Sequence, residues 1–267
     1  MAEQARIRTL KSLGQHFLVD KGIVRRIADA AGVAPGDTVL EVGPGRAILT
    51  CALLEKGANV VAVELDRGLH AELAERFAGE PRVTLHHRDA LKFPLDTLPV
   101  PYKVVANLPY QVTTPLLFHF LEANPAPSAI VVMIQHEVAQ RILARAGTKE
   151  YGVLTLGVAV RARASLCFTV PAGAFRPPPK VKSAVIRIVP RAEPLLPDAA
   201  VGDFMAVVRA ALGQRRKTLR NALGTLVADP ARIDAACAGA GINPAVRGET
   251  LDLDAYLRLT RALFPER

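Results

Sequence analysis

The sequence predicts a doubly wound α/β domain followed by a small domain made only of helices. In the first half of the chain, short apolar runs rich in β-branched residues alternate with amphipathic stretches, as in a largely parallel sheet covered by helices. The runs are continuously apolar rather than alternating, which indicates strands buried on both faces. From about residue 190 the strand pattern ends and helical patterns follow. We therefore predict two domains, over residues 1–190 and 191–267.

The elements of the first domain alternate along the chain. Strands are expected at residues 38–43, 59–65, 82–89, 102–109 and 128–135. Helices are expected after them, at residues 47–57, 67–79, 114–123 and 137–147. Gly57 and Gly79 mark two helix ends, because glycine adopts the left-handed conformation that closes a helix. Pro115 fits the first turn of its helix, where a missing N–H has no consequence.

The pattern changes after residue 152. Residues 154–170 and 183–190 are long strand candidates, joined by the proline-rich segment 171–181. Because no helix separates them, we expect these two strands to form an antiparallel edge of the sheet. Residues 190–200 form a linker, and the remaining helices are expected at residues 201–212, 215–227, 229–240 and 252–264.

The charge of the chain favours a polyanionic partner. The net charge is +9 and the isoelectric point is about 9.8, which suits nucleic acid or an anionic surface. The basic residues concentrate at residues 6–11, 175–182 and 214–220. In the last segment the cations are Arg215, Arg216, Lys217 and Arg220. A solvated helix face would have the same composition, but their position near a helix start favours contacts to RNA phosphates.

Other features argue against several classes of protein. No apolar run reaches the roughly 18 residues that span a bilayer, and the first residues lack the apolar core of a signal peptide. The three cysteines, Cys51, Cys167 and Cys237, are too far apart for a disulfide framework or a metal-ligand pattern. His86 and His87 have no third ligand at a metal-binding spacing. We expect a cytoplasmic protein without a metal site.

Three predicted strands end in residues suited to a cofactor. In doubly wound sheets the ligand crevice lies at the carboxyl ends of the strands. Gly43 and Gly45 follow the first strand and allow a tight turn with close backbone approach to a ligand. Glu64 ends the second strand, where a carboxylate accepts hydrogen bonds from ribose hydroxyls. Asp89, followed by Ala90, ends the third and is expected to accept from an adenine amino group.

The glycine turn argues for one kind of nucleoside cofactor. A nicotinamide fingerprint would place a small residue where this chain has Ile48. Glu41 precedes the turn, and a carboxylate there does not favour a pyrophosphate. S-adenosyl-L-methionine, a sulfonium with an amino-acid tail and an adenosine end, fits an acidic turn better. We therefore predict that it is the cofactor.

The fourth strand ends in Asn107, Leu108, Pro109 and Tyr110. A helix-capping turn would explain each residue alone, but not their combination at the cofactor crevice. The exocyclic amine of adenine is a poor nucleophile because its lone pair is delocalised into the ring. An oxygen of the Asn107 side chain and a carbonyl of Leu108 or Pro109 would draw the amine towards a tetrahedral shape, aimed at the methyl group. Proline fixes the backbone, and Tyr110 offers a flat face for the base.

The order of these motifs resembles the small-subunit ribosomal RNA adenine dimethyltransferase family. The similar segments are SLGQHFL, VLEVGPGRAILT, VELDR, RDAL, ANLPY, VPAGAFRPPPKVKSAVIRI and QRRKTLRNAL, which together span nearly the whole chain. The resemblance implies a Rossmann-like methyltransferase sheet with a C-terminal helical domain. It also implies N6,N6-dimethylation of two adjacent adenosines in the 3′-terminal hairpin loop of small-subunit rRNA. The implied partner is an immature small ribosomal subunit, bound by a monomer.

The resemblance also implies roles for further residues. His16 and Leu18 would line the cofactor site, and Phe175 would hold the target base against Tyr110. Many members carry glycine at the position of Ala47, a difference from which we expect little consequence. Two alternatives stay open. One is a resistance-type methyltransferase that acts on a large-subunit rRNA adenine, and the other is an assembly factor that binds RNA without catalysis.

Overall fold

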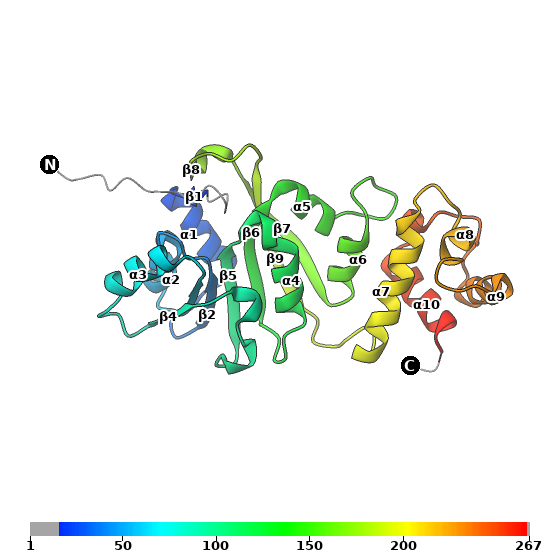
Figure 1. Ribbon diagram of the computed structural model, residues 1–267, viewed down its shortest axis with the longest axis horizontal. Helices are drawn as coiled ribbons and strands as arrows, with labels where there is room; N and C mark the ends of the chain where they lie inside the picture. Colours follow the sequence, from blue (N-terminus) through cyan, green and yellow to red (C-terminus); the bar gives the residue numbers. More distant parts are fainter. Residues whose placement is uncertain (1–15, 266–267) are drawn as a thin grey trace. The chain divides into compact units, whose positions relative to one another are not determined.

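The computed structural model describes residues 16–265, which form two compact units (Figure 1). The first unit holds the described residues up to His136 together with Leu166–Arg187. The second holds Glu137–Ser165 and the described residues from Ile188 onward. Residues 137–165, which were expected in the first domain, therefore group with the C-terminal helices. No helix between residues 16 and 265 combines the length and apolar character needed to cross a membrane.

A seven-stranded sheet has the order β4-β3-β2-β5-β6-β9-β7. Its strands are β2 Thr38–Val42, β3 Asn59–Glu64, β4 Val83–His87, β5 Tyr102–Asn107, β6 Ala129–Gln135, β7 Ala162–Val170 and β9 Ser183–Pro190. The pairs β2–β3, β3–β4, β2–β5 and β5–β6 are parallel. The chain proceeds outward from β2 in one direction and then restarts beside it at β5. This strand order, with helices between parallel strands, is that of a doubly wound sheet, so the predicted fold class is confirmed.

Strand β9 runs antiparallel to its neighbours in this sheet. The backbone N–H of His136, just after β6, donates to the carbonyl of Lys182, just before β9, over 3.0 Å. Likewise, the N–H of Arg191, just after β9, donates to the carbonyl of Arg161, just before β7, over 2.9 Å. The end of β6 thus lies beside the start of β9, and the end of β9 lies beside the start of β7. The expected antiparallel edge is present, with β9 reversed and β7 outermost.

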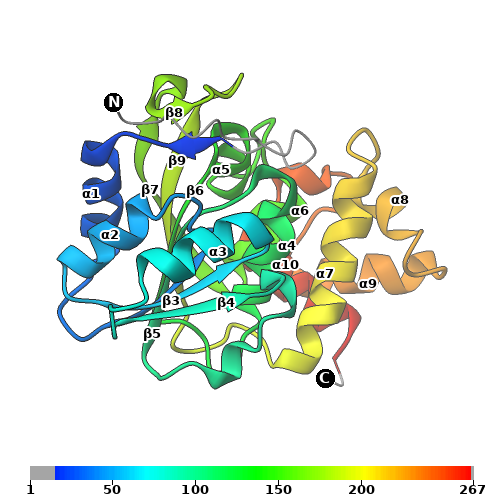
Figure 2. The ribbon, with the colours of Figure 1, turned by 60° about the vertical axis from the view of Figure 1, so that its left-hand side comes forward.

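The helices of the first unit connect the strands. They are α1 Lys21–Ala30, α2 Ile48–Glu55, α3 Arg67–Arg76 and α4 Thr113–Leu121. Helix α1, which the sequence patterns did not predict, lies against α2 (Figure 2). It begins at Asp20, whose side chain accepts the N–H groups of Gly22 and Ile23. The buried face of α1 joins a core formed with α2 and the strands.

One predicted strand is partly wrong. Residues 154–170 contain helix α6 Val153–Ala159 before strand β7 begins at Ala162. Nearly every side chain of α6 is buried, so its sequence is apolar without a helical period. A short, continuous apolar run of this kind is compatible with either a buried strand or a buried helix.

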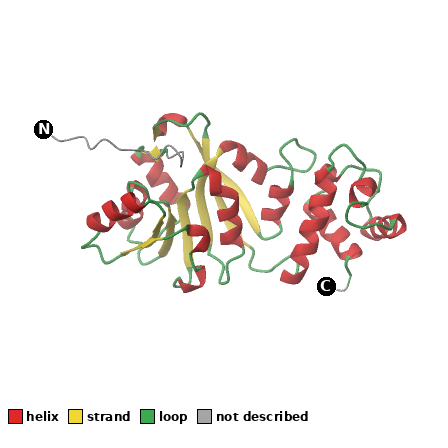
Figure 3. Ribbon diagram, in the orientation of Figure 1, coloured by secondary structure: helices red, strands yellow, loops and turns green. Residues whose placement is uncertain are grey.

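The second unit contains helices after β9 and no further strand in the part that the structure describes (Figure 3). They are α7 Asp198–Gly213, α8 Leu219–Leu223, α9 Pro230–Ala240 and α10 Leu253–Leu263, with α5 His136–Ile142 and α6 earlier in the chain. Phe204 and Tyr256 meet edge to face in its core, with ring centroids 6.5 Å apart. Helix α8 is shorter than predicted at both ends, because residues 214–217 and 224–226 form turns on either side of it.

Short elements complete the chain. Two-residue strands β1 Phe17–Leu18 and β8 Phe175–Arg176 pair antiparallel with each other. The 3-10 helices are η2 Ala90–Lys92, η3 Leu95–Thr97, η4 Tyr110–Val112, η5 Ala172–Ala174 and η6 Gly248–Thr250.

Candidate active site

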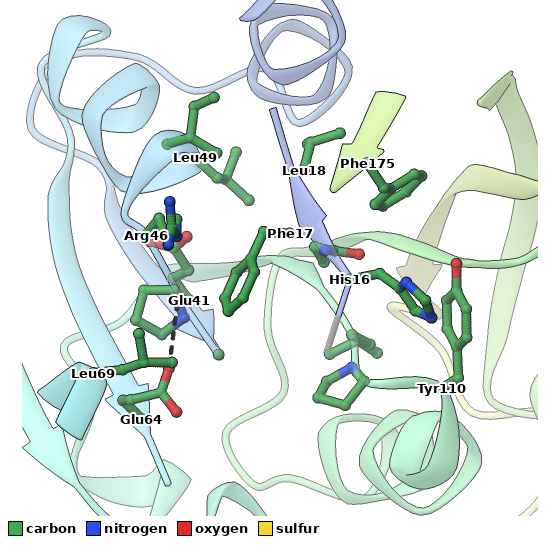
Figure 4. Close-up of a pocket in the computed structure, with 17 residues that line it drawn as sticks. His16, Phe17, Leu18, Glu41, Arg46, Leu49, Glu64, Leu69, Tyr110 and Phe175 are labelled. Carbon is green, nitrogen blue, oxygen red and sulfur yellow. Dashed lines mark hydrogen bonds between the residues drawn. The ribbon is translucent and has the colours of Figure 1, made fainter. Parts of the chain in front are cut away.

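A pocket of the first unit opens at the carboxyl ends of β2, β3 and β5 (Figure 4). This is the switch point of the sheet, where doubly wound folds bind their ligands. The lining residues that the sequence predicted are His16, Leu18, Gly43, Gly45, Glu64, Asn107, Leu108, Pro109, Tyr110 and Phe175. The structure therefore gathers most of the predicted cofactor and base-binding residues around one cavity.

The glycine turn after β2 has the backbone that its sequence requires. Gly43 and Gly45 have φ angles of 64° and 56°, in the left-handed region that favours glycine. A Cβ on Gly45 would lie 3.2 Å from the ring of Phe17, so this glycine also makes room for a neighbouring side chain. Ala47 is left-handed as well, at φ 59°, and fully buried. The expectation that alanine matters little here overlooked this conformation, which disfavours any residue with a Cβ.

Glu64 holds the glycine turn while lining the pocket. Its carboxylate accepts the backbone N–H of Gly45 over 3.3 Å (Figure 4). It also accepts the backbone N–H of Asp66 over 2.9 Å. The residue is 5% exposed, and burial raises its pKa. An oxygen of this carboxylate retains lone pairs for a further donor. A hydroxyl of a bound ribose is such a donor.

Glu41 adds a second buried carboxyl group to the same pocket. It accepts a hydrogen bond from Thr50 Oγ1 over 2.7 Å. Burial, opposed by this hydrogen bond and reinforced by the charge of Glu64, raises the pKa of Glu41 to about 8. Two buried carboxyl groups favour a cationic ligand, because a positive charge offsets the cost of ionising them. The pocket thus fits a sulfonium compound and disfavours a pyrophosphate.

Asn107 and Leu108 present two acceptors at the end of β5. The N–H of Leu108 donates to the carbonyl of Met133 over 3.1 Å, which anchors the turn to β6. The Pro109 carbonyl is already occupied, by the Val112 N–H at 3.2 Å and by Thr113 Oγ1 at 3.0 Å. No hydrogen bond to the Asn107 side chain or the Leu108 carbonyl is found within residues 16–265. Of the two carbonyls considered from the sequence, Leu108 is therefore the available one.

The ring of Tyr110 is held from its hydroxyl end. Its phenol oxygen lies 2.8 Å from Ser183 Oγ, and Ser183 is fully buried at the start of β9. Burial raises the pKa of Tyr110. The ring of His16 lies beside it, with centroids 6.3 Å apart and planes tilted by 33° (Figure 4). Tyr110 is thus a fixed aromatic wall of the pocket.

Strands β1 and β8 bring two remote motifs together at the pocket. Leu18 pairs with Phe175, and the N–H of Val19 donates to the carbonyl of Ala174 over 2.9 Å. His16 Nδ1 lies 2.8 Å from the carbonyl of Pro177, 161 residues away along the chain, so this nitrogen carries the proton. The sequence patterns alone did not foresee this pairing.

Phe175 lines the pocket but does not stack on Tyr110. The side chain is 1% exposed, and no ring contact joins the two residues in the described part of the chain. The ring next to Tyr110 is that of His16 instead. The role of Phe175 in holding a base stays a prediction.

Asp89 and Ala90 are not among the residues that line this pocket. Asp89 Oδ1 accepts the N–H of Leu91 over 3.0 Å and thereby caps η2. Its other carboxylate oxygen and the second lone pair of Oδ1 stay available for the proposed contact to adenine. Residues 6–11, the first predicted basic run, lie outside the described residues.

The predicted RNA-binding cations differ in their surroundings. Arg215 donates to the carbonyls of Lys149 at 2.8 Å and Tyr151 at 2.7 Å, and pairs with Glu249 at 3.2 Å. Arg220 pairs with Asp234 at 2.7 Å. Arg216 and Lys217 are exposed, and no partner for either side chain is found between residues 16 and 265. Within the described residues, their side chains are therefore the least engaged of the four cations.

Sequence reasoning gave no site role to four of the lining residues, which are Phe17, Arg46, Leu49 and Leu69. Phe17 lines the cavity between His16 and Leu18, and the guanidinium of Arg46 lies 5.2 Å from the centre of its ring. Phe17 belongs to the GQHFL segment, so that motif held the signal. Among residues 16–265, no group of three or more His, Cys, Asp or Glu side chains could hold a metal ion.

The chain is similar to proteins of one family over nearly its whole length. The model of the ribosomal RNA adenine dimethylase family matches residues 6–263. Ribosomal RNA small subunit methyltransferase A of Moorella thermoacetica is 45% identical over 264 residues, covering 95% of this chain and 92% of the relative. The protein of that name from Methylococcus capsulatus is 46% identical over 258 residues, covering 96% and 98%.

Solved structures of an rRNA methyltransferase and a dimethyladenosine transferase are similar to this chain as well. The dimethyladenosine transferase from Plasmodium falciparum has a TM-score of 0.78 at 26% identity, covering 91% of this chain and 96% of that chain. The 23S rRNA methyltransferase ErmE has a TM-score of 0.73 at 30% identity, covering 92% and 99%. The chain belongs to the ribosomal RNA adenine dimethylase family.

Proposed function

We propose that this enzyme transfers methyl groups from S-adenosyl-L-methionine to the N6 atoms of two adjacent adenosines. Its proposed substrate is the 3′-terminal hairpin loop of small-subunit rRNA within an immature small ribosomal subunit. The observation that carries the proposal is a pair of acceptors, the Asn107 amide oxygen and the Leu108 carbonyl, beside an acidic pocket at the switch point. Neither acceptor receives a hydrogen bond from any residue between 16 and 265.

The pocket residues fit the cofactor. When bound, S-adenosyl-L-methionine supplies an electrophilic methyl group on a sulfonium. Glu64 would accept from the ribose, and the Gly43–Gly45 turn would allow the methionine part to approach the backbone closely. His16 and Leu18 would line the methionine side, with the second nitrogen of His16 free to contact the ligand, because Nδ1 is used by Pro177. Asp89 would reach the adenine amino group through its carboxylate.

The chemistry then depends on the orientation of the target amine. Two acceptors on the two N–H bonds would draw the N6 lone pair out of conjugation and point it at the methyl carbon. The Asn107 oxygen and the Leu108 carbonyl provide these acceptors on a rigid strand end, so little reorganisation is needed. The methylated nitrogen is acidic and loses its proton to water without a dedicated base.

The base itself would be extruded from the RNA and held by aromatic rings. Tyr110, fixed by Ser183, offers one face. Phe175 would take the other face, which requires its buried ring to move towards the pocket opening. His16 already lies beside Tyr110 and would mark the floor of the base site.

The C-terminal helical domain, residues 191–267, would position the RNA. Arg216 and Lys217 are the exposed cations suited to phosphate contacts, with Arg215 and Arg220 contributing through their remaining N–H groups. Contacts to phosphates position the RNA but do not select its sequence. Because they are ionic, the RNA affinity should fall steeply as the salt concentration rises. The protein would act as a monomer.

A second candidate is methylation of a large-subunit rRNA adenine. The structural similarity to the 23S rRNA methyltransferase ErmE, at a TM-score of 0.73, supports this candidate. The identities of 45% and 46% to small-subunit methyltransferases favour the first proposal. Purified immature small subunits and large subunits should be incubated separately with the enzyme and cofactor. Mass spectrometry of the rRNA should then find dimethyladenosine in the small-subunit hairpin. Dimethyladenosine confined to large-subunit rRNA would reverse the choice, and none in either would leave only an RNA-binding role.

A further inference from the structure

A second cleft in the first unit adjoins the cofactor pocket. Its volume is about 330 Å³, and residues of α1, α2 and the end of α3 line it. The cleft shares Leu18, Arg46 and Ile48 with the pocket, so these side chains form a common wall. We call it the basic cleft, lined by Leu18, Val19, Lys21, Val24, Arg25, Arg46, Ile48, Cys51, Ala52, Glu55 and Arg76.

The charge of the basic cleft is one-sided. Four cationic side chains face a single carboxylate, that of Glu55. Lys21 and Arg25 stand one turn apart on α1, where like charges repel each other. Both are exposed, and no ion pair to either occurs within residues 16–265. A group of cations without protein partners is stabilised when an anion binds among them.

Arg76 supports the far wall of the cleft. Its guanidinium donates to the carbonyl of Arg46 over 2.9 Å and to Cys51 Sγ over 3.1 Å. These bonds tie the end of α3 to the start of α2. The guanidinium of Arg46 in turn lies over the ring of Phe17, on the wall that separates the cleft from the cofactor pocket. The cations at this wall are therefore held in place.

The floor of the basic cleft is apolar. Leu18, Val24, Ile48 and Ala52 contribute to it, and Val19 is 41% exposed there. An apolar floor with a cationic rim is complementary to a nucleotide, whose base and sugar are flat or apolar and whose phosphates are anionic. A lone inorganic anion would leave the floor uncovered. An RNA strand that delivers an adenosine to the neighbouring pocket carries such nucleotides on either side of it.

We propose that the basic cleft binds the RNA backbone next to the target adenosine, with Lys21, Arg25 and Arg46 contacting its phosphates. This proposal rests on the RNA-methylating function proposed above. It places an RNA contact on the catalytic unit, in addition to the one predicted for residues 214–220. Phosphate contacts of this kind hold the substrate in register. Their number determines how steeply the RNA affinity falls with salt concentration.

The test compares two doubly substituted proteins. Lys21→Ala with Arg25→Ala removes two charges from the cleft. Lys56→Ala with Arg82→Ala is the matched control, because each of these cations is paired, with Asp29 and Glu80, and neither lines the cleft. The affinity for a small-subunit hairpin RNA is measured over a series of salt concentrations. Methylation by the wild-type enzyme is recorded in parallel on purified immature small ribosomal subunits, the proposed substrate.

The cleft variant should bind the RNA about tenfold more weakly. The slope of log affinity against log salt should fall by roughly 0.7–0.9 per lost phosphate contact. Its methylation rate at saturating RNA should change little, whereas the control should keep the wild-type slope. An unchanged slope in the cleft variant, with wild-type methylation intact, would overturn the cleft proposal alone. An absence of wild-type methylation would overturn the proposed function and this inference together.

The three cysteines provide an independent readout on the wild-type protein. Cys51 lines the cleft, Cys167 is partly exposed elsewhere in the first unit, and Cys237 is buried. Bound RNA should slow the alkylation of Cys51 relative to Cys167. An unchanged ratio of the two rates at saturating RNA would count against occupancy of the cleft.

Discussion

The phenol oxygen of Tyr110 lies 2.8 Å from the hydroxyl oxygen of Ser183, and the bond connects two segments 73 residues apart. Ser183 is fully buried and stands at the first position of β9. The bond therefore ties the turn that follows β5 to the antiparallel strand of the sheet. A tyrosine held at its hydroxyl end keeps its ring face in one orientation, which is what a stacking wall for an extruded base requires.

This bond predicts a coupled effect of two substitutions. Tyr110→Phe and Ser183→Ala each remove it while keeping the ring, and each should lower kcat/KM for the RNA by a few-fold, since one hydrogen bond is worth about 1 kcal/mol. The double variant should be no worse than the single ones, because both lose the same contact. Tyr110→Ala should lose about 1–3 kcal/mol of stacking in addition. Fully additive losses in single-turnover assays would show that the bond does not orient the ring.

Asn107 should govern the chemical step. Asn107→Ala removes an acceptor from the target amine, and we expect methyl transfer to fall by about two to three orders of magnitude, as for other lost transition-state hydrogen bonds. RNA affinity should change less than about threefold, because phosphate contacts dominate it. Asn107→Asp retains an acceptor oxygen and should keep more activity than the alanine variant. Parallel losses of binding and rate would contradict the assignment.

Glu64 should matter first for the cofactor. Glu64→Ala removes the acceptor proposed for the ribose and releases the N–H of Gly45 from its 3.3 Å contact. Cofactor affinity, measured by calorimetry, should fall by at least about tenfold, as expected for a hydrogen bond to a charged group. Glu64→Gln, which keeps an acceptor, should show a smaller loss. Wild-type affinity in the alanine variant would remove Glu64 from the cofactor site.

Glu41 should make the stability of the protein depend on pH. Its pKa is raised from 4.5 to about 8 in the folded protein, mainly by burial. Between these values the unfolded chain releases the proton and the folded one retains it, so the free energy of unfolding should decrease as pH rises from about 4.5 to 8. Glu41→Gln can still accept from Thr50 and should be more stable than the wild type at pH 8, with the difference vanishing near pH 4.5. Urea unfolding at several pH values measures this. A constant difference would indicate that Glu41 is ionised in the folded protein.

Arg215 and Arg216 are neighbours that should behave differently. Arg215 bonds the carbonyls of Lys149 and Tyr151 and pairs with Glu249, so Arg215→Ala should destabilise the second unit by about 1–3 kcal/mol. The ion pair itself adds little, because both groups are partly exposed. Arg216→Ala should leave the midpoint of thermal unfolding unchanged while reducing RNA affinity. If Arg216→Ala lowered stability and Arg215→Ala lowered only RNA affinity, the structural and RNA-binding roles would have to be exchanged.

Most of the sheet was predictable because its strands are buried on both faces. Their sequences are continuously apolar, and glycine and proline mark the ends of the helices between them. The same continuous pattern explains the error at residues 154–159. A helix buried on all sides, such as α6, has no polar face to mark its period. Helix α1 was missed even though its charged and apolar faces are distinct, because no strand pattern leads into it.

The sequence by itself determined the parts of this protein that are continuous in the chain: the glycine turn, the acidic strand end at Glu64 and the acceptor turn at Asn107 and Leu108. Each depends on local backbone geometry, which short runs of residues specify. The tertiary structure alone decided which remote segments meet. It paired Leu18 with Phe175 and Tyr110 with Ser183, and it engaged Arg215 within the protein. These choices follow from how the strands and helices pack, and that packing depends on contacts among residues far apart in the chain.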